Sequence, residues 1–468
     1  MAKKIALILL CGILSLNISA QHPYEPLLGF WKGTLKIMSG DSLSLVMAVL
    51  PDGDSVKVEL DSPDQFVTGI AVDFFSFQQD SIEFKVRSMA TTYTGTYDSS
   101  TQMIVGTFMQ GKFKRKLSLS KIKERPVIYR PQEPHPPYPY REEEVTILHP
   151  DTKSPWTQGT LTLPENKSPR ALVILISGSG WQDRDETIMG HKPFKVMADF
   201  LTRHDYAVFR YDDLPQYFFR QATTKDFADA VSLIIDSLSA QPRFQELPAG
   251  LLGHSEGGLV AFMTAACDKR VNFVISMAGM ADGMKNTLLY QIEAITGKDS
   301  NFTKEDIDAS LEISNKIYSA IEKSKTKEKA LEKCKRILEK YDAKYSDEQK
   351  NKIGLSFENR MATLSIIASP WYYYLFHIDT KDFIKKVRCP VYALNGENDL
   401  QVDYRTHLEV LRLNLPPNKQ TEIVSFPKLN HLFQESETGL PSEYGLIEQT
   451  ISPDVPESIV NWLLEIGY

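Results

Sequence analysis

The stretch Gly253-His254-Ser255-Glu256-Gly257-Gly258 decides the fold of the longer part of this chain. It follows a short apolar segment at residues 250–253 and precedes a helix that we expect over residues 259–266. A serine on such a sharp strand-to-helix turn needs small neighbours two residues to either side, because the backbone there is strained and closely packed. The turn would expose Ser255 Oγ at a helix N-terminus, where developing negative charge is favoured. An ordinary glycine turn is the alternative, and the flanking strand and helix favour a nucleophile.

A serine needs a base and a group that orients the base, and after such a turn the acid precedes the histidine along the chain. A strand predicted at residues 391–394 leads into a turn that carries Asp399, and a strand at residues 421–425 leads to His431. In a parallel sheet both turns emerge at the same edge as Ser255. We therefore predict a triad of Ser255, Asp399 and His431.

Each of these roles has rivals in the sequence. Glu397 comes earlier in the same turn, and Asp403 is expected to begin the next helix. Among the histidines, His407 lies in that helix and His377 follows a helical stretch. His254 is adjacent to the nucleophile, so its side chain is expected to point away from the catalytic pocket. Asp399 and His431 remain the preferred residues.

An oxyanion needs two hydrogen-bond donors. The first expected donor is the backbone N–H of Glu256, directly after the nucleophile. The second should come from the glycine-rich turn after Ile176, where we favour the N–H of Ser179 over that of Gly180. This turn lacks the third glycine of a dinucleotide-binding loop. The chemistry requires no metal and no organic cofactor.

The surrounding sequence alternates continuous apolar strands with helices, which predicts a mostly parallel, doubly wound sheet covered on both faces. The strands are expected at residues 171–176, 207–211 and 271–277, and helices at 193–201, 224–238 and 456–466. Between about residues 284 and 371 the strand pattern stops and helical spacing takes over, with Thr303 as a candidate N-cap. We interpret this stretch as a helical lid inserted into the sheet domain, a dimer surface being the alternative.

Residues 23–124 have a different pattern, typical of a small all-β, barrel-like or sandwich domain. Strands are predicted at residues 43–50, 55–60, 69–75, 81–86, 103–109 and 116–119. Six prolines between residues 126 and 139 predict an extended linker over residues 125–141 that separates this domain from the one at 142–468. The β domain serves for packing or for ligand binding, and the residues do not distinguish these roles.

Residues 1–20 predict a signal peptide and hence a secreted or periplasmic protein. Lys3 and Lys4 precede an apolar run that ends in small residues, and the run is short for a membrane span. The net charge of −7 and the lack of a basic stripe argue against a nucleic-acid partner. The three cysteines beyond the signal peptide have no metal-ligand or disulfide-framework spacing.

Several of these segments together resemble the bacterial α/β-hydrolase family of EstD-like serine esterases, from about residue 142 to the C-terminus. The segments are residues 175–186, 191–194, 253–258, 395–399, 429–434 and 451–453. The N-terminal β domain also resembles the one in longer members of this family. The resemblance implies an α/β-hydrolase fold and hydrolysis of short-chain carboxylic esters through an acyl-enzyme, and Ser255, Asp399 and His431 match the family's triad positions.

One departure from the family lies after Arg210-Tyr211-Asp212-Asp213. The family usually continues with an Arg-Gly-x-Gly turn, whereas this chain continues through residues 214–219 with Leu-Pro-Gln-Tyr-Phe-Phe. This turn borders the expected substrate region, so the preference for the acyl or alcohol group is expected to differ.

Two other functions remain open at this stage. A peptidase or acyl-aminopeptidase would need an anchor for a peptide terminus, for which Asp183, Asp185 and Glu186 are candidates. A glycan-binding protein with a vestigial hydrolase domain is the second, against which the intact triad argues. The expected partner is a small-molecule ester, and a sugar-linked acetate, a lipid and a xenobiotic ester fit equally well.

Overall fold

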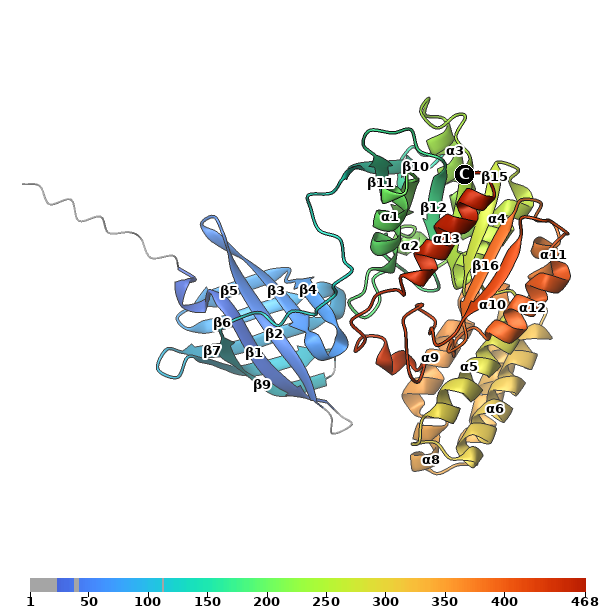
Figure 1. The fold of residues 1–468 in the computed structure, drawn as a ribbon. Helices are drawn as coiled ribbons and strands as arrows, with labels where there is room; N and C mark the ends of the chain where they lie inside the picture. Colours follow the sequence, from blue (N-terminus) through green and yellow to red (C-terminus); the bar gives the residue numbers. More distant parts are fainter. Residues whose placement is uncertain (1–22, 38–41, 112) are drawn as a thin grey trace, which may run out of the picture. The chain divides into compact units, whose positions relative to one another are not determined.

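The computed structural model describes residues 23–37, 42–111 and 113–468, and it divides the chain into two compact units, Met1–Ile128 and Tyr129–Tyr468 (Figure 1). The expected signal peptide at residues 1–20 lies outside the described residues and stays a prediction. In the described ranges, no helix is both long and apolar enough to cross a membrane.

The first unit is a nine-stranded antiparallel sheet whose strands follow the order β4-β3-β2-β1-β9-β8-β7-β6-β5. The strands are β1 (Gly29–Lys36), β2 (Ser42–Asp52), β3 (Ser55–Ser62), β4 (Val67–Ala71), β5 (Phe74–Gln78), β6 (Ser81–Val86), β7 (Thr91–Asp98), β8 (Met103–Gln110) and β9 (Phe113–Ile122). Single 3₁₀ turns occupy Glu25–Leu27, Pro63–Gln65 and Arg87–Met89. The all-β pattern that the sequence predicts for this part of the chain is therefore present.

The two edge strands of this sheet, β4 and β5, are joined by only Val72 and Asp73. The Val72 N–H donates to the carbonyl of Val58 in β3 at 3.1 Å, and the Asp73 N–H donates to that of Lys85 in β6 at 2.9 Å. The chain thus passes from one edge strand to the other within two residues, so the sheet must curl, which gives the barrel-like form. The prediction of one strand over residues 69–75 is wrong, because the chain changes neighbours at these two residues.

Large side chains fill the interior of the barrel. Trp31, Phe84 and Tyr93 are fully or almost fully buried, and the rings of Phe84 and Tyr93 stack with centroids 5.0 Å apart. The Tyr93 hydroxyl donates to the carbonyl of Leu117 at 3.0 Å, so its polar end is satisfied inside the apolar core. The domain is thus held together by a packed core.

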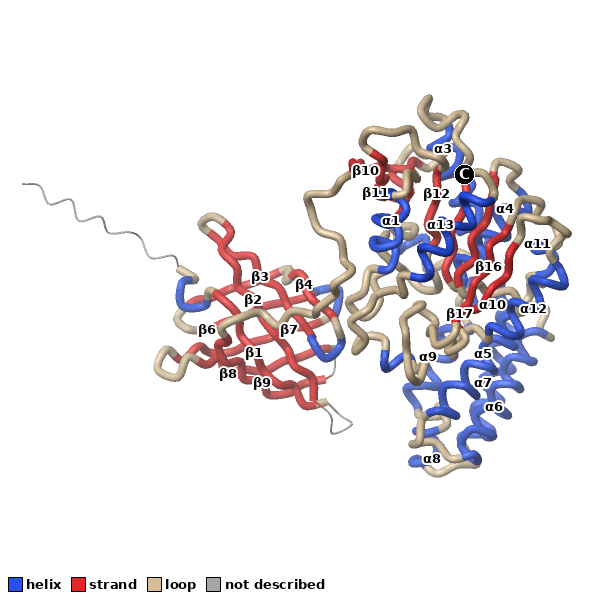
Figure 2. Tube along the Cα trace, viewed as in Figure 1, coloured by secondary structure: helices blue, strands red, loops and turns tan. Residues whose placement is uncertain are grey.

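The second unit contains an eight-stranded sheet in the order β10-β11-β13-β12-β14-β15-β16-β17, drawn as red strands in Figure 2. Its strands are β10 (Tyr140–Leu148), β11 (Pro155–Pro164), β12 (Leu172–Ile176), β13 (Ala207–Tyr211), β14 (Ala249–His254), β15 (Val271–Met277), β16 (Val391–Gly396) and β17 (Glu422–Phe426). The six strands from β12 onward run parallel, and β10 and β11 add an antiparallel edge. The carboxyl ends of β12, β14, β16 and β17 consequently lie along one edge of the sheet.

Helices cover both faces of this sheet, because alternate residues of its strands point to opposite sides. In β12, Leu172 and Ile174 pack into the core that contains α3 and α4, whereas Val173 and Leu175 pack into the core with α1 and α13. The helices of this part are α1 (Pro193–Arg203), α2 (Gln216–Phe219), α3 (Thr224–Ser239), α4 (Glu256–Cys267), α11 (Lys381–Ile384), α12 (Tyr404–Asn414) and α13 (Asp454–Glu465), with a 3₁₀ turn at Pro441–Glu443. The continuous apolar segments in the sequence predict this arrangement, in which both faces of the sheet are buried.

The regular structure between β15 and β16 is helical, as the spacing of the sequence predicts. The inserted helices are α5 (Met284–Lys298), α6 (Lys304–Glu322), α7 (Lys327–Asp342), α8 (Asp347–Lys352), α9 (Phe357–Ile367) and α10 (Pro370–Leu375), and α11 follows them before β16. Thr303 caps α6 by accepting the N–H of Asp306, and Ile313, Ile317 and Cys334 join the helices through a buried core. The insertion is therefore a folded helical layer.

The proline-rich segment is bound to the second unit from Tyr129 onward. The Gln132 side chain accepts the N–H of Thr450 at 2.6 Å, and Glu133 pairs with Lys192 at 2.7 Å. Strand β10 already begins at Tyr140, inside the predicted linker. Much of residues 125–141 thus belongs to the larger unit, because its extended backbone leaves side chains free to bind that unit.

Candidate active site

The turn after β14 holds Ser255 in a strained conformation. Ser255 has φ +55° and ψ −119°, a combination that few residues with a side chain adopt, and its N–H donates to the carbonyl of Met277 at 2.9 Å. A Cβ on Gly253 would lie 2.1 Å from the Gly257 carbonyl oxygen, and one on Gly257 would lie 2.1 Å from that of Ile176. The glycines are therefore required by close packing, as the sequence pattern implies.

Asp399 and His431 are buried and lie within ion-pair distance of each other, at the same edge of the sheet as Ser255. His431 Nδ1 lies 2.8 Å from Asp399 Oδ2, while Asp399 Oδ1 accepts the N–H groups of Gln401 at 2.7 Å and Val402 at 2.9 Å. Asp399 is 0% exposed and His431 5%. Because Nδ1 is engaged by the carboxylate, Nε2 is the ring nitrogen that is left to accept a proton.

The rival residues have other partners in the structure. Glu397 accepts the hydroxyl of Ser425, and Asp403 caps α12 by accepting backbone N–H groups, as its sequence position predicts. His407 lies in α12, where its Nδ1 accepts the N–H of Ala281 at 2.9 Å and burial lowers its pKa to about 4. In the described part of the chain, none of these three side chains is hydrogen-bonded to His431.

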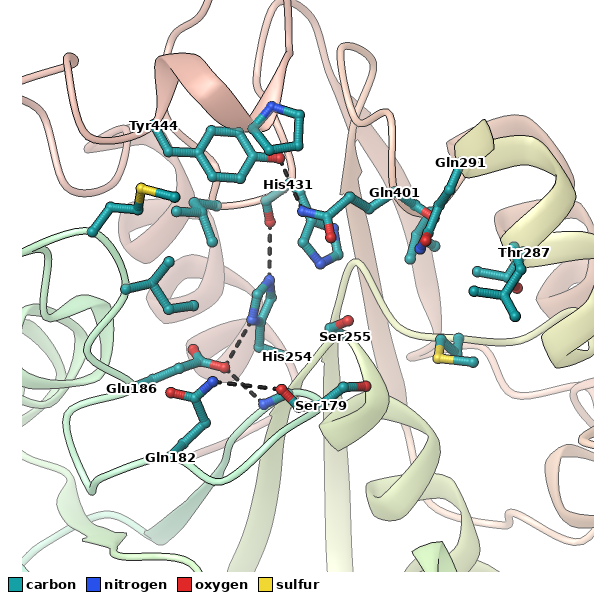
Figure 3. Close-up of a pocket in the computed structure, with 18 of the residues that line it drawn as sticks. Ser179, Gln182, Glu186, His254, Ser255, Thr287, Gln291, Gln401, His431 and Tyr444 are labelled. Carbon is teal, nitrogen blue, oxygen red and sulfur yellow. Dashed lines mark hydrogen bonds and ion pairs between the residues drawn. The ribbon is translucent and has the colours of Figure 1, made fainter. Parts of the chain in front are cut away.

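A cavity of about 450 Å³ contains both Ser255 and His431 in its lining (Figure 3). The remaining lining comes from the segments that follow β12, β15, β16 and β17 and from α5 and α10, and it includes Gly178, Ser179, Thr287, Gln291, Trp371 and Tyr444. The structure thus brings the predicted nucleophile and the predicted base to one cavity.

His254 does not point away from this cavity, and that prediction is wrong. Figure 3 shows its ring between Glu186 and His431: Nδ1 lies 2.9 Å from Glu186 Oε1, and Nε2 lies 2.9 Å from the carbonyl oxygen of His431. Burial opposes the charged ring, but the charge and hydrogen bond of Glu186 outweigh it, so the pKa of His254 is raised. His254 therefore joins the nucleophile strand to the backbone of the base, a link that no local sequence pattern signals.

The two expected oxyanion donors lie on adjacent turns. Glu256 is the first residue of α4, and Ser179 lines the cavity. The N–H of Gly178 is already used, because it donates to Glu186 Oε1 at 2.7 Å. The use of the Ser179 and Glu256 N–H groups for an oxyanion stays a prediction.

The side chain of Glu256 is a feature that the sequence analysis missed, since only its backbone N–H was considered. Its buried carboxyl accepts hydrogen bonds from Thr224 Oγ1 at 2.7 Å, Ser179 Oγ at 2.8 Å and Trp371 Nε1 at 2.8 Å. Burial raises the pKa of Glu256, and the three donors only partly oppose this rise. The carboxyl thereby joins α3, the turn after β12 and the helical insertion.

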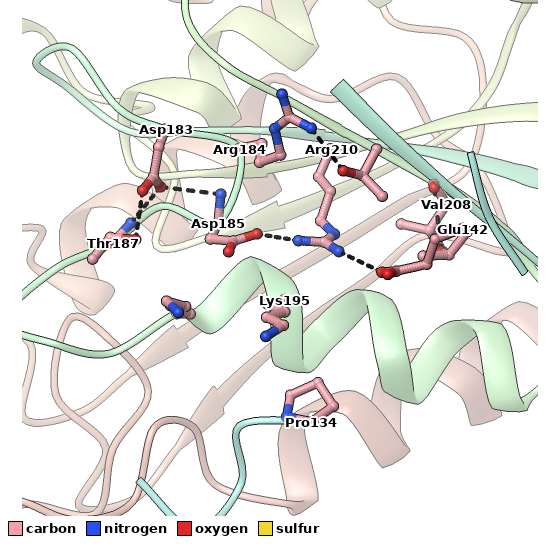
Figure 4. A network of polar contacts seen from close by, with 12 residues as sticks. Pro134, Glu142, Asp183, Arg184, Asp185, Thr187, Lys195, Val208 and Arg210 are labelled. Atoms are coloured by element: carbon pink, nitrogen blue, oxygen red, sulfur yellow. Dashed lines mark hydrogen bonds and ion pairs between the residues drawn. The ribbon is translucent and has the colours of Figure 1, made fainter. Parts of the chain in front are cut away.

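Ion pairs hold the loop between β12 and α1, as Figure 4 shows. Arg210 pairs with Asp185 and, at 3.0 Å, with Glu142. Asp183 Oδ1 accepts the N–H of Thr187 at 3.0 Å. These contacts fix the loop that carries Ser179.

The same contacts bear on the anchor that a peptidase would need. Asp183 stabilises its own turn, Asp185 is paired with Arg210, and Glu186 is 1% exposed and bound to His254. All three candidate carboxylates are committed to internal partners.

The turn that departs from the family pattern is tied to the same loop. Asp213 accepts the N–H of Gln182 at 2.8 Å and the Ser177 hydroxyl at 3.2 Å, and Leu214 accepts the indole N–H of Trp181 at 3.2 Å. Burial raises the pKa of Asp213 to about 7, and the neighbouring acidic side chains add to the rise.

A sheet covered by helices on both faces, with a strained serine after one strand and a histidine–aspartate pair after two others, defines the α/β-hydrolase fold. Over 334 residues the chain is 22% identical to Esterase EstD from Thermotoga maritima, a match that covers 70% of this chain and 69% of that protein. The resemblance to the EstD-like bacterial esterases is thereby confirmed. No model in a scan of protein families matches the chain.

Solved structures also align with the chain. Dienelactone hydrolase from Anabaena variabilis is 15% identical, with a TM-score of 0.40, and the alignment covers 70% of this chain and 99% of that one. Est1E from Butyrivibrio proteoclasticus is 14% identical, with a TM-score of 0.38, over 69% of this chain and 98% of that one.

Proposed function

We propose that this protein is a serine hydrolase that cleaves carboxylic esters, with a preference for short acyl chains. The observation that carries the proposal is the 2.8 Å contact between His431 and Asp399 in the wall of the cavity that also contains Ser255. The relationship to an esterase supports an ester as the substrate.

In the proposed mechanism, His431 Nε2 takes the proton of Ser255 Oγ as this oxygen attacks the ester carbonyl. Asp399 holds the imidazole in the tautomer with Nδ1 protonated and stabilises its cation. The N–H groups of Ser179 and Glu256 bind the oxyanion. His431 then protonates the leaving alcohol. In the second half of the reaction, His431 takes a proton from the water that attacks the acyl-enzyme and returns it to Ser255 Oγ as the acid leaves.

We further propose that the helical insertion acts as a lid. Thr287 and Gln291 of α5 and Trp371 of α10 line the catalytic cavity, so the insertion forms part of its wall. A substrate would therefore contact the insertion as it binds. This wall would exclude water and shape the acyl or alcohol preference.

The two rival functions have weaker support. A peptidase would need an anchor for a peptide terminus, and Asp183, Asp185 and Glu186 have internal partners. A vestigial hydrolase in a glycan-binding protein would have no need for a buried histidine–aspartate contact beside a strained serine. Export to the periplasm or outside the cell is proposed from residues 1–20 alone.

The test compares wild type with Ser255→Ala on p-nitrophenyl acetate, butyrate and octanoate and on aminoacyl-p-nitroanilides. We expect ester turnover that is fastest on the short chains and that falls on the order of 10⁴-fold or more in the variant. A fluorophosphonate probe should label wild type and not Ser255→Ala. Anilide turnover without ester turnover would move the assignment to a peptidase, and no Ser255-dependent turnover or labelling would overturn the proposal.

A further inference from the structure

A second cavity, of about 520 Å³, adjoins the catalytic one. The two share Trp371 in their lining, and the turn after β12 contributes Ser179 to the first and Gly180 to the second. The second cavity therefore lies next to the expected positions of the substrate carbonyl and its oxyanion, with Trp371 between the two spaces.

Aromatic rings form much of the wall of the second cavity. Phe219 and Phe227 stack with ring centroids 5.2 Å apart and an interplanar angle of 21°, and Trp371 lies on the wall shared with the catalytic cavity. The indole N–H of Trp371 is bound to Glu256 at 2.8 Å, which restrains the ring. Flat, restrained aromatic walls favour a flat aromatic ligand.

Arg220 is the ionisable residue of this cavity, since its other described lining residues are apolar, serine or glycine. Its side chain is exposed, and the ion pairs of the described chain do not include it. A guanidinium without an acidic partner next to aromatic rings is complementary to a carboxylate carried on an aromatic ring.

Phe219 is the last residue of the segment where the sequence departs from its family, and Arg220 directly follows it. Residues 214–219 replace the usual Arg-Gly-x-Gly turn, and they form the short helix α2 (Gln216–Phe219) that precedes Arg220. The departure therefore supplies one aromatic wall and positions the cation of the second cavity.

We propose that this second cavity is a subsite for an aromatic group that carries a negatively charged substituent, on the acyl or the alcohol side of the ester. The proposal rests on the proposed esterase function and names its substrate class. Arg220 binds the anionic substituent, and Phe219, Phe227 and Trp371 contact the ring.

The experiment uses two pairs of substrates, and in each pair a ring carboxylate is replaced by a neutral methyl group. Methyl 3-(4-carboxyphenyl)propanoate and methyl 3-(4-methylphenyl)propanoate test the acyl side, and 2-(4-carboxyphenyl)ethyl acetate and 2-(4-methylphenyl)ethyl acetate test the alcohol side. We expect kcat/KM to favour the carboxylate by about 10- to 100-fold in one pair, the range of a charge-assisted hydrogen bond.

The Arg220→Gln variant should bring that ratio close to one, and Arg220→Glu should reverse it toward the 4-aminomethyl analogue. Arg412→Gln, at an exposed arginine of α12 that pairs with Glu409, is the control and should keep the wild-type ratio. A wild-type ratio near one in both pairs, or an Arg220→Gln ratio equal to that of wild type, would overturn the subsite. If p-nitrophenyl acetate is hydrolysed in a Ser255-dependent way in those cases, the esterase function stands; if it is not, both proposals fall.

Discussion

The ring of His254 binds the backbone of His431: its Nε2 lies 2.9 Å from the carbonyl oxygen of the proposed base. The other ring nitrogen lies 2.9 Å from Glu186 Oε1, and both side chains are buried. The residue before the nucleophile thus positions the loop that carries the base. This contact relates two segments that are 177 residues apart.

Replacing His254 with alanine should therefore lower kcat while leaving the three proposed triad residues in place. We expect a fall of about 10- to 100-fold, because displacement of a catalytic group by about 1 Å has an effect of this size. Stability should fall by about 3 kcal/mol, because a buried carboxylate loses its partner. Ester kinetics and urea unfolding measure the two effects.

The two side chains are tested together by comparing the single variants His254→Ala and Glu186→Gln with the double variant. If the two side chains act as one unit, the double variant should lose less stability than the sum of the single variants. Strict additivity, or a His254→Ala enzyme with the wild-type kcat, would contradict the positioning role.

Asp399→Asn tests the orientation of the base. The amide can donate a hydrogen bond to Nδ1 and favour the wrong tautomer, so kcat for a short-chain ester at neutral pH should fall on the order of 10⁴-fold, as in other serine hydrolases with this arrangement. Glu397→Gln, in the same turn but bound to Ser425, is the matched control and should stay within about twofold of wild type. Equal effects of the two substitutions would remove Asp399 from the triad.

Two substitutions of Glu256 test whether stability and turnover depend on its negative charge or on its hydrogen bonds. Glutamine can accept from Thr224 and Trp371 through one oxygen and donate to Ser179 through its nitrogen, so Glu256→Gln should keep kcat within a few-fold of wild type. Glu256→Ala leaves these donors without an acceptor and should lower stability by about 2–4 kcal/mol and kcat at least tenfold. Thermal unfolding and ester kinetics distinguish the variants. A glutamine variant as poor as the alanine variant would show that the negative charge itself is needed.

The raised pKa of Asp213 leads to a prediction of how the stability of the folded protein depends on pH. Its pKa in the folded protein is about 7, above the ordinary value of 3.8, so the folded state binds more protons than the unfolded state between these values. The free energy of unfolding should therefore fall as the pH rises from about 4 to 7, by at most about 1.4 kcal/mol per pH unit from this group.

In Asp213→Asn this contribution should vanish, so the slope of stability against pH should be less negative than in wild type over the same range. Urea unfolding at pH 4.5, 5.5 and 6.5 measures it. The slope is compared rather than the absolute stability, because asparagine also loses one of the acceptors used by Gln182 and Ser177. Identical slopes would show that Asp213 titrates normally.

Local patterns in the sequence predicted most elements of the larger unit because burial on both sheet faces produces continuous apolar strands. The strand at residues 271–277 matches β15 residue for residue. The helix after Ser255 was expected to begin at residue 259 but begins at Glu256, because packing overrides the low helix propensity of the two glycines. The antiparallel pair of β10 and β11 was not predicted, since β10 carries four charged residues in succession, Arg141–Glu144, which is not a typical strand pattern.

Sequence patterns alone were enough to predict the sharp turn at Ser255, the positions of Asp399 and His431 after later strands, and the alternation that brings all three to one sheet edge. These features depend on neighbours along the chain, so a local pattern is enough to detect them. The hydrogen-bond partners of Glu256 and His254, and the place of Arg220 in one cavity with Trp371, emerge only in the tertiary structure, because each depends on segments brought together by folding. Trp371 reaches Glu256 across 115 positions, and no periodicity or spacing encodes a contact of that range.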